Sequence, residues 1–128
     1  YERIKFRNII PAYSKDRLVL LSTHIVSDVE HIAAQIMMME YGDIQHIRTG
    51  EEYIHMMEGR VWLAEMPAEQ LMDYQNRAVI SNVRAKTGRM EVRIIEDIKP
   101  VSDAVQAVPT LEDAYLYLFN YLPGKAGR

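Results

Sequence analysis

The sequence predicts an α/β part followed by a small α+β part with an antiparallel sheet. Two observations predict the first part: a short apolar run at residues 18–23, typical of a buried parallel strand, and a helix-opening pattern directly after it. The second part is predicted by the order strand, helix, hairpin and helix that follows Gly59. We therefore expect one domain at residues 1–58 and another at residues 59–128.

The first part is expected to alternate helices with strands. Two capping boxes open helices, because Ser27 precedes Glu30 and Thr49 precedes Glu52 by three residues. The pair Tyr41-Gly42 is typical of a hairpin turn. The expected elements are a helix at 1–13, a strand at 18–23, a helix at 28–35, hairpin strands at 37–40 and 43–47, and a short helix to about residue 57.

The second part is expected to be a sheet with helices on one of its faces. Pro67 suits the first residue of a short helix, and Thr110 suits a helix cap. Alternation of Val92 and Ile94 with polar neighbours predicts a strand with one buried face. The expected elements are a strand at 60–65, a helix at 67–74, hairpin strands at 77–85 and 89–96, a short helix at 100–108 and a helix at 111–122.

Composition excludes several classes of protein. With 128 residues, 48% of them hydrophobic and 26% charged, the chain is an ordinary globular protein. A net charge of −3 argues against binding to nucleic acid. The absence of cysteine excludes disulfides and thiolate metal sites. No apolar stretch approaches the roughly 20 residues that cross a bilayer, so any membrane connection is expected to run through a partner.

His24 is the principal candidate for chemistry, because it lies between the predicted strand and the predicted helix. In α/β folds this position, at the carboxyl end of a strand, is where ligands bind. An imidazole there suits a phosphate contact or proton transfer, and the alternative is a histidine that caps the helix or binds a loop carbonyl. Ser22 and Thr23 suit the same phosphate site, or else hydrogen bonds to the local backbone. Asp28 and Glu30 suit helix capping better than catalysis.

Other candidate residues have simpler structural explanations. The four histidines lack the spacing of metal ligands, so no metal site is expected. The methionine run at residues 37–39 is more typical of a buried strand than of a binding surface. Trp62, Tyr115 and Tyr117 are aromatic candidates for a ligand groove, although aromatic residues at these spacings are more often part of a core.

Four segments carry a resemblance to a known family. Residues 18–30, LVLLSTHIVSDVE, resemble the histidine switch loop of ABC transporter ATP-binding subunits, with its preceding strand and following helix. Residues 2–10 are similar to the helix after the family's Asp-Pro dimer contact, and residues 36–44 to its closing strand, glycine turn and next strand. Residues 109–118 are similar to the C-terminal helix of bacterial exporter-type members that carry a small extra domain. The resemblance spans nearly the whole chain, and its specific part is the histidine segment.

The resemblance implies the C-terminal part of a P-loop-type nucleotide-binding domain followed by an accessory domain. His24 would contact the γ-phosphate of ATP and help hold the attacking water, with Thr23 beside it as a second cofactor-binding residue. The full-length parent would use ATP and Mg²⁺. The sequence contains no G-x-x-x-x-G-K-[ST] phosphate loop, so this chain alone is not expected to bind cofactor or hydrolyse ATP. The missing motifs would lie before Tyr1.

The resemblance also implies partners and a location. A membrane permease and a second ATP-binding subunit are expected for the parent, which would lie in the cytoplasm at the inner face of the membrane and power transport, with export favoured. A homodimer is expected as well, and no nucleic acid. The alternative is a standalone interaction or regulatory module, in which residues 60–122 self-associate or dock a partner.

Overall fold

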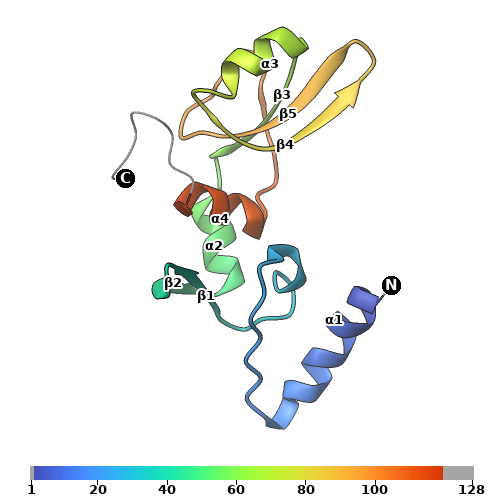
Figure 1. Cartoon of the computed structure of the whole chain (residues 1–128), viewed down its shortest axis with the longest axis vertical. Coiled ribbons are helices and arrows are strands. Elements are labelled where there is room, and N and C mark those ends of the chain that lie inside the picture. The colour runs from blue at the N-terminus through green and yellow to red at the C-terminus, as the bar shows by residue number, and fades with distance from the viewer. Residues whose placement is uncertain (1, 120–128) are drawn as a thin grey trace. The chain divides into compact units, whose positions relative to one another are not determined.

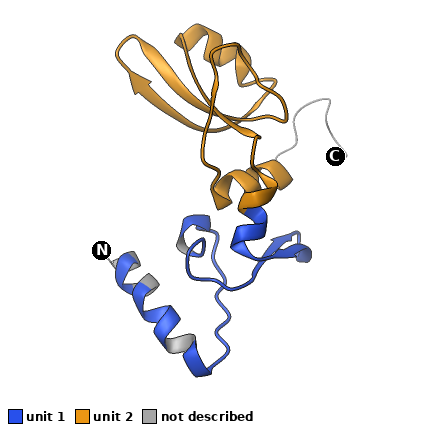
Figure 2. Ribbon diagram, turned by 180° about the vertical axis from the view of Figure 1, so that it is seen from behind, with its two compact units in different colours: residues 1–53 blue, residues 54–128 orange. Residues whose placement is uncertain are grey.

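The computed structural model describes residues 2–119 and divides the chain into two compact units, residues 1–53 and residues 54–128 (Figure 2). This division lies a few residues before Gly59, where the sequence places the domain boundary. The two units are described separately. The longest helix in the described part of the chain has 12 residues, which is too short to cross a membrane.

The first unit contains helices and one small sheet (Figure 1). The long N-terminal helix is confirmed, and Pro11 lies inside its last turn rather than ending it. The hairpin and the short helix after it are also confirmed. The elements are α1 (Glu2–Tyr13), a 3₁₀ turn (Ser14–Asp16), a second 3₁₀ turn (Val26–Asp28), β1 (Ile36–Glu40), β2 (Asp43–Arg48) and α2 (Gly50–Met56), which continues into the second unit.

The predicted strand at residues 18–23 is wrong for this structure, because that segment contains no helix or strand. Its leucines are exposed, Leu18 by 97% and Leu20 by 80%, while Val19 is partly buried. A parallel strand needs neighbouring strands for its backbone hydrogen bonds, and the sheet of this unit consists of β1 and β2. Residues 18–23 therefore have the composition of a strand but pair with no other strand in the described part of the chain.

The predicted helix at residues 28–35 is also wrong. A 3₁₀ turn at Val26–Asp28 is followed by single turns, in which the Val29 carbonyl accepts hydrogen bonds from Ile32 and Ala33. Ser27 lies inside the 3₁₀ turn, so it does not cap a helix as expected. A short helix is only marginally stable unless its apolar face packs against the rest of the protein. Residues 28–35 are too few to form a stable helix without such packing.

The buried side chains of the β1–β2 hairpin lie on β1, while β2 is exposed along almost its whole length. Tyr41 (φ 53°) and Gly42 (φ 82°) form the tight turn that the sequence predicts. Ile36 and Met38 are buried, but Met37, which pairs with Ile47, is 46% exposed. The methionine run therefore fills the core at alternate positions only.

The capping box at the start of α2 is confirmed. The Glu52 amide donates to the Thr49 hydroxyl (3.1 Å), and the Thr49 amide donates to the Glu52 carboxylate (2.9 Å). Tyr53 is fully buried, and its hydroxyl donates to the Ile36 carbonyl (3.0 Å), which joins α2 to the hairpin. α2 is thereby held at its first turn and along its buried face.

The second unit is an α+β domain with an antiparallel four-stranded sheet in the order β4-β5-β3-β6. The strand that opens the unit is confirmed, as is the hairpin. The helices that precede and follow this hairpin in the sequence are also confirmed. Pro67 precedes α3 as its cap residue rather than opening it. The elements are β3 (Val61–Met66), α3 (Ala68–Tyr74), β4 (Val79–Lys86), β5 (Arg89–Ile95), β6 (Val105–Gln106) and α4 (Leu111–Phe119).

The two helices of this unit contact opposite faces of the sheet, so the expectation of a single helical face is wrong. Leu71 and Tyr74 of α3 lie in one buried cluster with the inward residues of β3 and β5, among them Val92. Arg93, the next residue of β5, points to the other face and binds Asp113 of α4. Successive side chains of a strand alternate between faces, so one strand serves both helices.

The predicted short helix at residues 100–108 is wrong. The chain turns where the Ala104 amide donates to the Val101 carbonyl (3.1 Å), and it then forms the two-residue strand β6. The Ala107 amide donates to the Val61 carbonyl (2.9 Å), which fixes β6 beside β3. α4 is confirmed as far as Phe119, and the last three residues of the predicted helix lie outside the described part of the chain.

Candidate functional site

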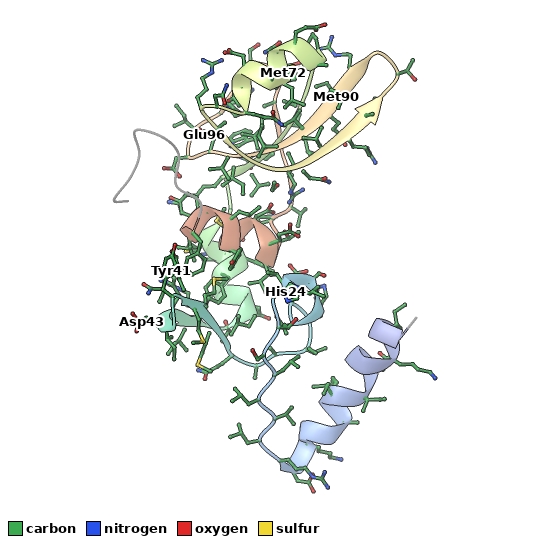
Figure 3. All side chains as sticks on the ribbon, viewed as in Figure 1. His24, Tyr41, Asp43, Met72, Met90 and Glu96 are labelled. Atoms are coloured by element: carbon green, nitrogen blue, oxygen red, sulfur yellow. The ribbon has the colours of Figure 1, made fainter. Side chains whose placement is uncertain are left out.

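His24 lies on an exposed bend between the extended apolar segment and the 3₁₀ turn at Val26–Asp28 (Figure 3). The bend contains a hydrogen bond of 3.0 Å from the Ile25 amide to the Thr23 hydroxyl oxygen. The two predicted cofactor-binding residues, His24 and Thr23, are thus neighbours on one solvent-facing turn. The imidazole is accessible to a ligand, and the Thr23 oxygen is used by the backbone.

The segment after His24 packs closely on the start of α2, within the same unit. Gly50 is buried, and a Cβ atom at this position would lie 3.3 Å from the Glu30 carbonyl oxygen. A larger residue at Gly50 would push the two segments apart. The carboxylate of Glu30 lies 3.3 Å from His31 Nε2.

The histidines of the chain do not gather into one site. Among the described residues, no group of three or more histidine or carboxylate side chains is close enough to hold a metal ion. The other three histidines lie apart, on the turn after the 3₁₀ helix, on β2 and on α2: His31, His46 and His55.

A different polar site in the second unit escaped the sequence analysis. The Arg93 guanidinium donates to both carboxylate oxygens of Asp113, at 3.0 Å and 2.6 Å, and also to the Val108 carbonyl at 2.7 Å. Asp113 is 1% exposed. It also accepts hydrogen bonds from the amide and hydroxyl of Thr110, which complete a capping box at the start of α4.

The electrostatics of this site follow from its hydrogen bonds. Burial by itself would raise the pKa of Asp113, but the bonds from Arg93 and Thr110 outweigh burial and hold that pKa below its ordinary value. The same contact with Asp113 raises the pKa of Arg93. Both groups are charged and are held by each other and by Val108 and Thr110, so they form a structural ion pair rather than a reactive one. The three-residue spacing of Thr110 and Asp113 is a sequence signal for the helix cap. The sequence contains no comparable signal for the bond between Arg93 and Asp113.

An open cleft of about 510 Å³ lies where β6 begins beside β3. Its charged lining includes Glu65 and Glu91, and both carboxylates lie 3.2 Å from the Lys86 ammonium. Arg84 also binds Glu91 at 2.8 Å. The full lining is Leu63, Ala64, Glu65, Arg89, Glu91, Asp103 and Val105. These ion pairs neutralise much of the charge of the two glutamates. The charge of the cleft therefore does not indicate a particular class of ligand.

The aromatic residues proposed for a ligand groove do not line this cleft. Trp62 is in the core with 8% exposure, and its indole N–H donates to the Glu96 carbonyl at 3.1 Å. The Tyr117 hydroxyl donates to Asp97 at 3.1 Å, and Arg60 lies 5.2 Å from the centre of the Tyr117 ring. Tyr115 stacks at a tilt on Phe119, with 5.0 Å between the ring centres. These contacts support structural roles for all three aromatic candidates.

No protein-family model matches the chain, and no curated protein matches it.

Proposed function

We propose that the chain is the C-terminal part of an ABC transporter ATP-binding subunit, and that His24 belongs to the ATP site of the complete protein. The observation that carries the proposal is the exposed His24 turn at the end of an apolar strand-like run, in the sequence LVLLSTHIVSDVE. A neutral imidazole donates a hydrogen bond to a phosphate oxygen, and a protonated one adds a positive charge near polyphosphate.

The exposed apolar run supports the finer part of the proposal, which is a P-loop-type fold for the parent. Among the side chains that the structure describes before His24, Leu18 and Leu20 are the most exposed large apolar ones. Burial of each is worth about 1.5–3 kcal/mol, so a sheet that accepts residues 18–23 as a strand would gain much of its stability from them. In the proposed parent, that sheet would also carry the phosphate loop that this chain lacks.

The proposed mechanism assigns a limited role to this chain. Phosphoryl transfer depends on positioning and on neutralising charge around the transferred group. His24 would donate to the γ-phosphate and help orient the attacking water, while Thr23 lies beside it. ATP, Mg²⁺, the permease and a second ATP-binding subunit belong to the complete protein, at the inner face of the membrane, in a transporter for which export is favoured.

The first test is the coding sequence immediately before Tyr1. We expect a glycine-rich phosphate loop, a Ser-Gly-Gly signature and an Asp-Pro pair there. The complete protein should hydrolyse ATP, and His24→Ala should lower its turnover by about 100-fold or more, since removal of one charge-stabilising donor costs this much in other enzymes. His31→Ala, at an exposed histidine of the same unit, is the matched control and should leave turnover unchanged. A start codon directly before Tyr1, without those motifs, would contradict the proposal.

The second candidate function is the standalone interaction module that the sequence places at residues 60–122, and one observation outside those residues, in the first unit, also favours self-association. Met37, Met39, Ile44 and Ile47 form an exposed apolar face on the β1–β2 hairpin. Such faces are common at contacts between proteins. If the coding sequence begins directly before Tyr1 and contains none of the ATP-site motifs, this second function is the better account.

A further inference from the structure

The bend at His24 is closed by a side chain rather than by regular secondary structure. The Thr23 hydroxyl oxygen accepts a hydrogen bond of 3.0 Å from the Ile25 amide, two residues later. This is the geometry of an ST-turn, in which a hydroxyl takes the place of a backbone carbonyl. His24 is the residue enclosed by the turn, and its side chain is exposed.

The direction of the chain after His24 follows from this turn. The 3₁₀ turn at Val26–Asp28 begins directly after Ile25, and the Val29 amide donates to the Val26 carbonyl at 3.2 Å. Ile25 itself has extended backbone angles, φ −96° and ψ 95°. The Thr23 bond therefore lies at the point where the extended segment changes into helical turns, with His24 at its apex.

We infer that Thr23 is a positioning residue for His24, and this inference rests on the proposed function. The hydroxyl oxygen that could have faced a phosphate accepts from the Ile25 amide instead. It holds the backbone so that the imidazole projects from the turn toward the ATP site of the complete protein. Because the bond is local, it needs no neighbouring strand, and it is present even where residues 18–23 form no sheet.

The turn itself is tested on the 128-residue chain by amide hydrogen exchange at Ile25. Thr23→Val keeps the shape of the side chain and removes the acceptor, so exchange should become about 2–5-fold faster, as loss of one exposed hydrogen bond predicts. Thr23→Ser keeps the acceptor and should restore the original rate. Ser22→Ala removes the adjacent exposed hydroxyl and is the matched control, with no change expected. Unchanged exchange in Thr23→Val would overturn the inference.

The effect on His24 is tested by ATP hydrolysis in the complete protein. Thr23→Val should lower kcat by about 10-fold without changing KM for ATP, because a misplaced imidazole affects the reacting state more than binding. Thr23→Ser should restore kcat. A higher KM with unchanged kcat would make Thr23 a phosphate ligand and overturn the inference, as would full activity of Thr23→Val beside an inactive His24→Ala. If the unmodified protein hydrolyses no ATP, the proposed function fails and the positioning role fails with it, although the exchange result still establishes the turn.

Discussion

Arg93 on β5 and Asp113 on α4 bind each other through two hydrogen bonds, 3.0 Å and 2.6 Å long, on the face of the sheet opposite α3. Asp113 is 1% exposed, while the Arg93 side chain is 19% exposed. The pair fixes the C-terminal helix to the second strand of the central hairpin. It is the most deeply buried charged contact among those described, so it is the best place to test the stability of the second unit.

Replacing Asp113 should strongly destabilise the chain. In Asp113→Asn the guanidinium of Arg93 loses its counter-charge in a largely buried site, and we expect the free energy of unfolding to fall by about 3 kcal/mol. Urea unfolding followed by circular dichroism measures the change. Glu112→Gln, at the exposed neighbouring residue of α4, is the matched control and should shift stability by less than about 0.5 kcal/mol. Equal effects of the two variants would show that the pair contributes little.

The contribution of Asp113 should also depend on pH. Its pKa in the folded chain lies below the ordinary value of 3.8, because hydrogen bonds from Arg93 and Thr110 outweigh the effect of burial. The unfolded chain therefore binds this proton at a higher pH than the folded chain does, and acid favours unfolding. The stability from Asp113 should be complete above about pH 5 and lost as the pH falls through the lower folded pKa.

Urea titrations of the unmodified chain and of Asp113→Asn, run from about pH 7 to about pH 2, measure this dependence. The gap in the free energy of unfolding should be constant near neutral pH and should close in acid. A gap that stays constant down to the lowest pH would mean that the carboxylate charge is not what stabilises α4.

Thr49 should stabilise the start of α2 through its side chain. Its hydroxyl accepts from the Glu52 amide at 3.1 Å, so Thr49→Ala leaves that amide without its cap and should cost about 1 kcal/mol. Thr49→Ser keeps the hydroxyl and should retain most of the stability. Thermal unfolding of the three proteins gives the comparison, and equal melting temperatures for Thr49→Ala and Thr49→Ser would refute the capping role.

Ser81 should be a site where a smaller side chain stabilises the protein. Its hydroxyl is buried without a hydrogen-bond partner at the irregular position of β4, between Ile80 and Asn82. Ser81→Ala removes the buried polar group, and we expect a gain of about 1 kcal/mol in the free energy of unfolding. Ser102→Ala, at an exposed serine of the same unit, should be neutral. A loss of stability in Ser81→Ala would indicate an unseen partner for the hydroxyl.

The exposed face of the β1–β2 hairpin should govern self-association. Met37 and Ile47 pair across the strands and are 46% and 54% exposed. The double variant Met37→Thr with Ile47→Thr should change stability by less than about 1 kcal/mol but weaken self-association in sedimentation experiments. Met38→Thr, at a buried position of the same strand, should instead destabilise the fold by more than about 2 kcal/mol. If the unmodified chain remains monomeric at high concentration, the prediction is wrong.

Local signals predicted the parts of the fold that depend on neighbouring residues. The β1–β2 turn at Tyr41-Gly42 requires positive φ angles, which a Gly-containing pair supplies. The cap at Thr49 depends on a residue only three positions away, and the alternation in β5 depends on the strand alone. These features depend on few residues, but the same three-residue spacing at Ser27 and Glu30 did not open a helix, so a local signal predicts a cap only where the rest of the helix packs.

Features that depend on distant partners were not predictable in the same way. The run at residues 18–23 has the composition of a strand, but a strand also needs neighbours, and the structure provides none for it. β6 has two residues and exists because β3 lies beside it. Likewise, Thr110 signalled the cap of α4, but no local pattern revealed that Arg93 would reach Asp113. His24 is exposed, in agreement with its position directly after the apolar run at residues 18–23. The hydrogen bond from the Ile25 amide to the Thr23 hydroxyl could be seen only in the structure.

The strand order β4-β5-β3-β6 has a consequence for synthesis of the chain on the ribosome. β3 is made first, but it pairs with β5 and β6 and has no contact in the ladder with the element that follows it directly, α3. The backbone of β3 has no strand to pair with, and the fully buried Val61 has no partner on β5, until β5 has left the exit tunnel. A nascent chain that pauses between α3 and β5 would thus present an open strand edge to chaperones, and the sheet would be complete only after β6 has emerged as well.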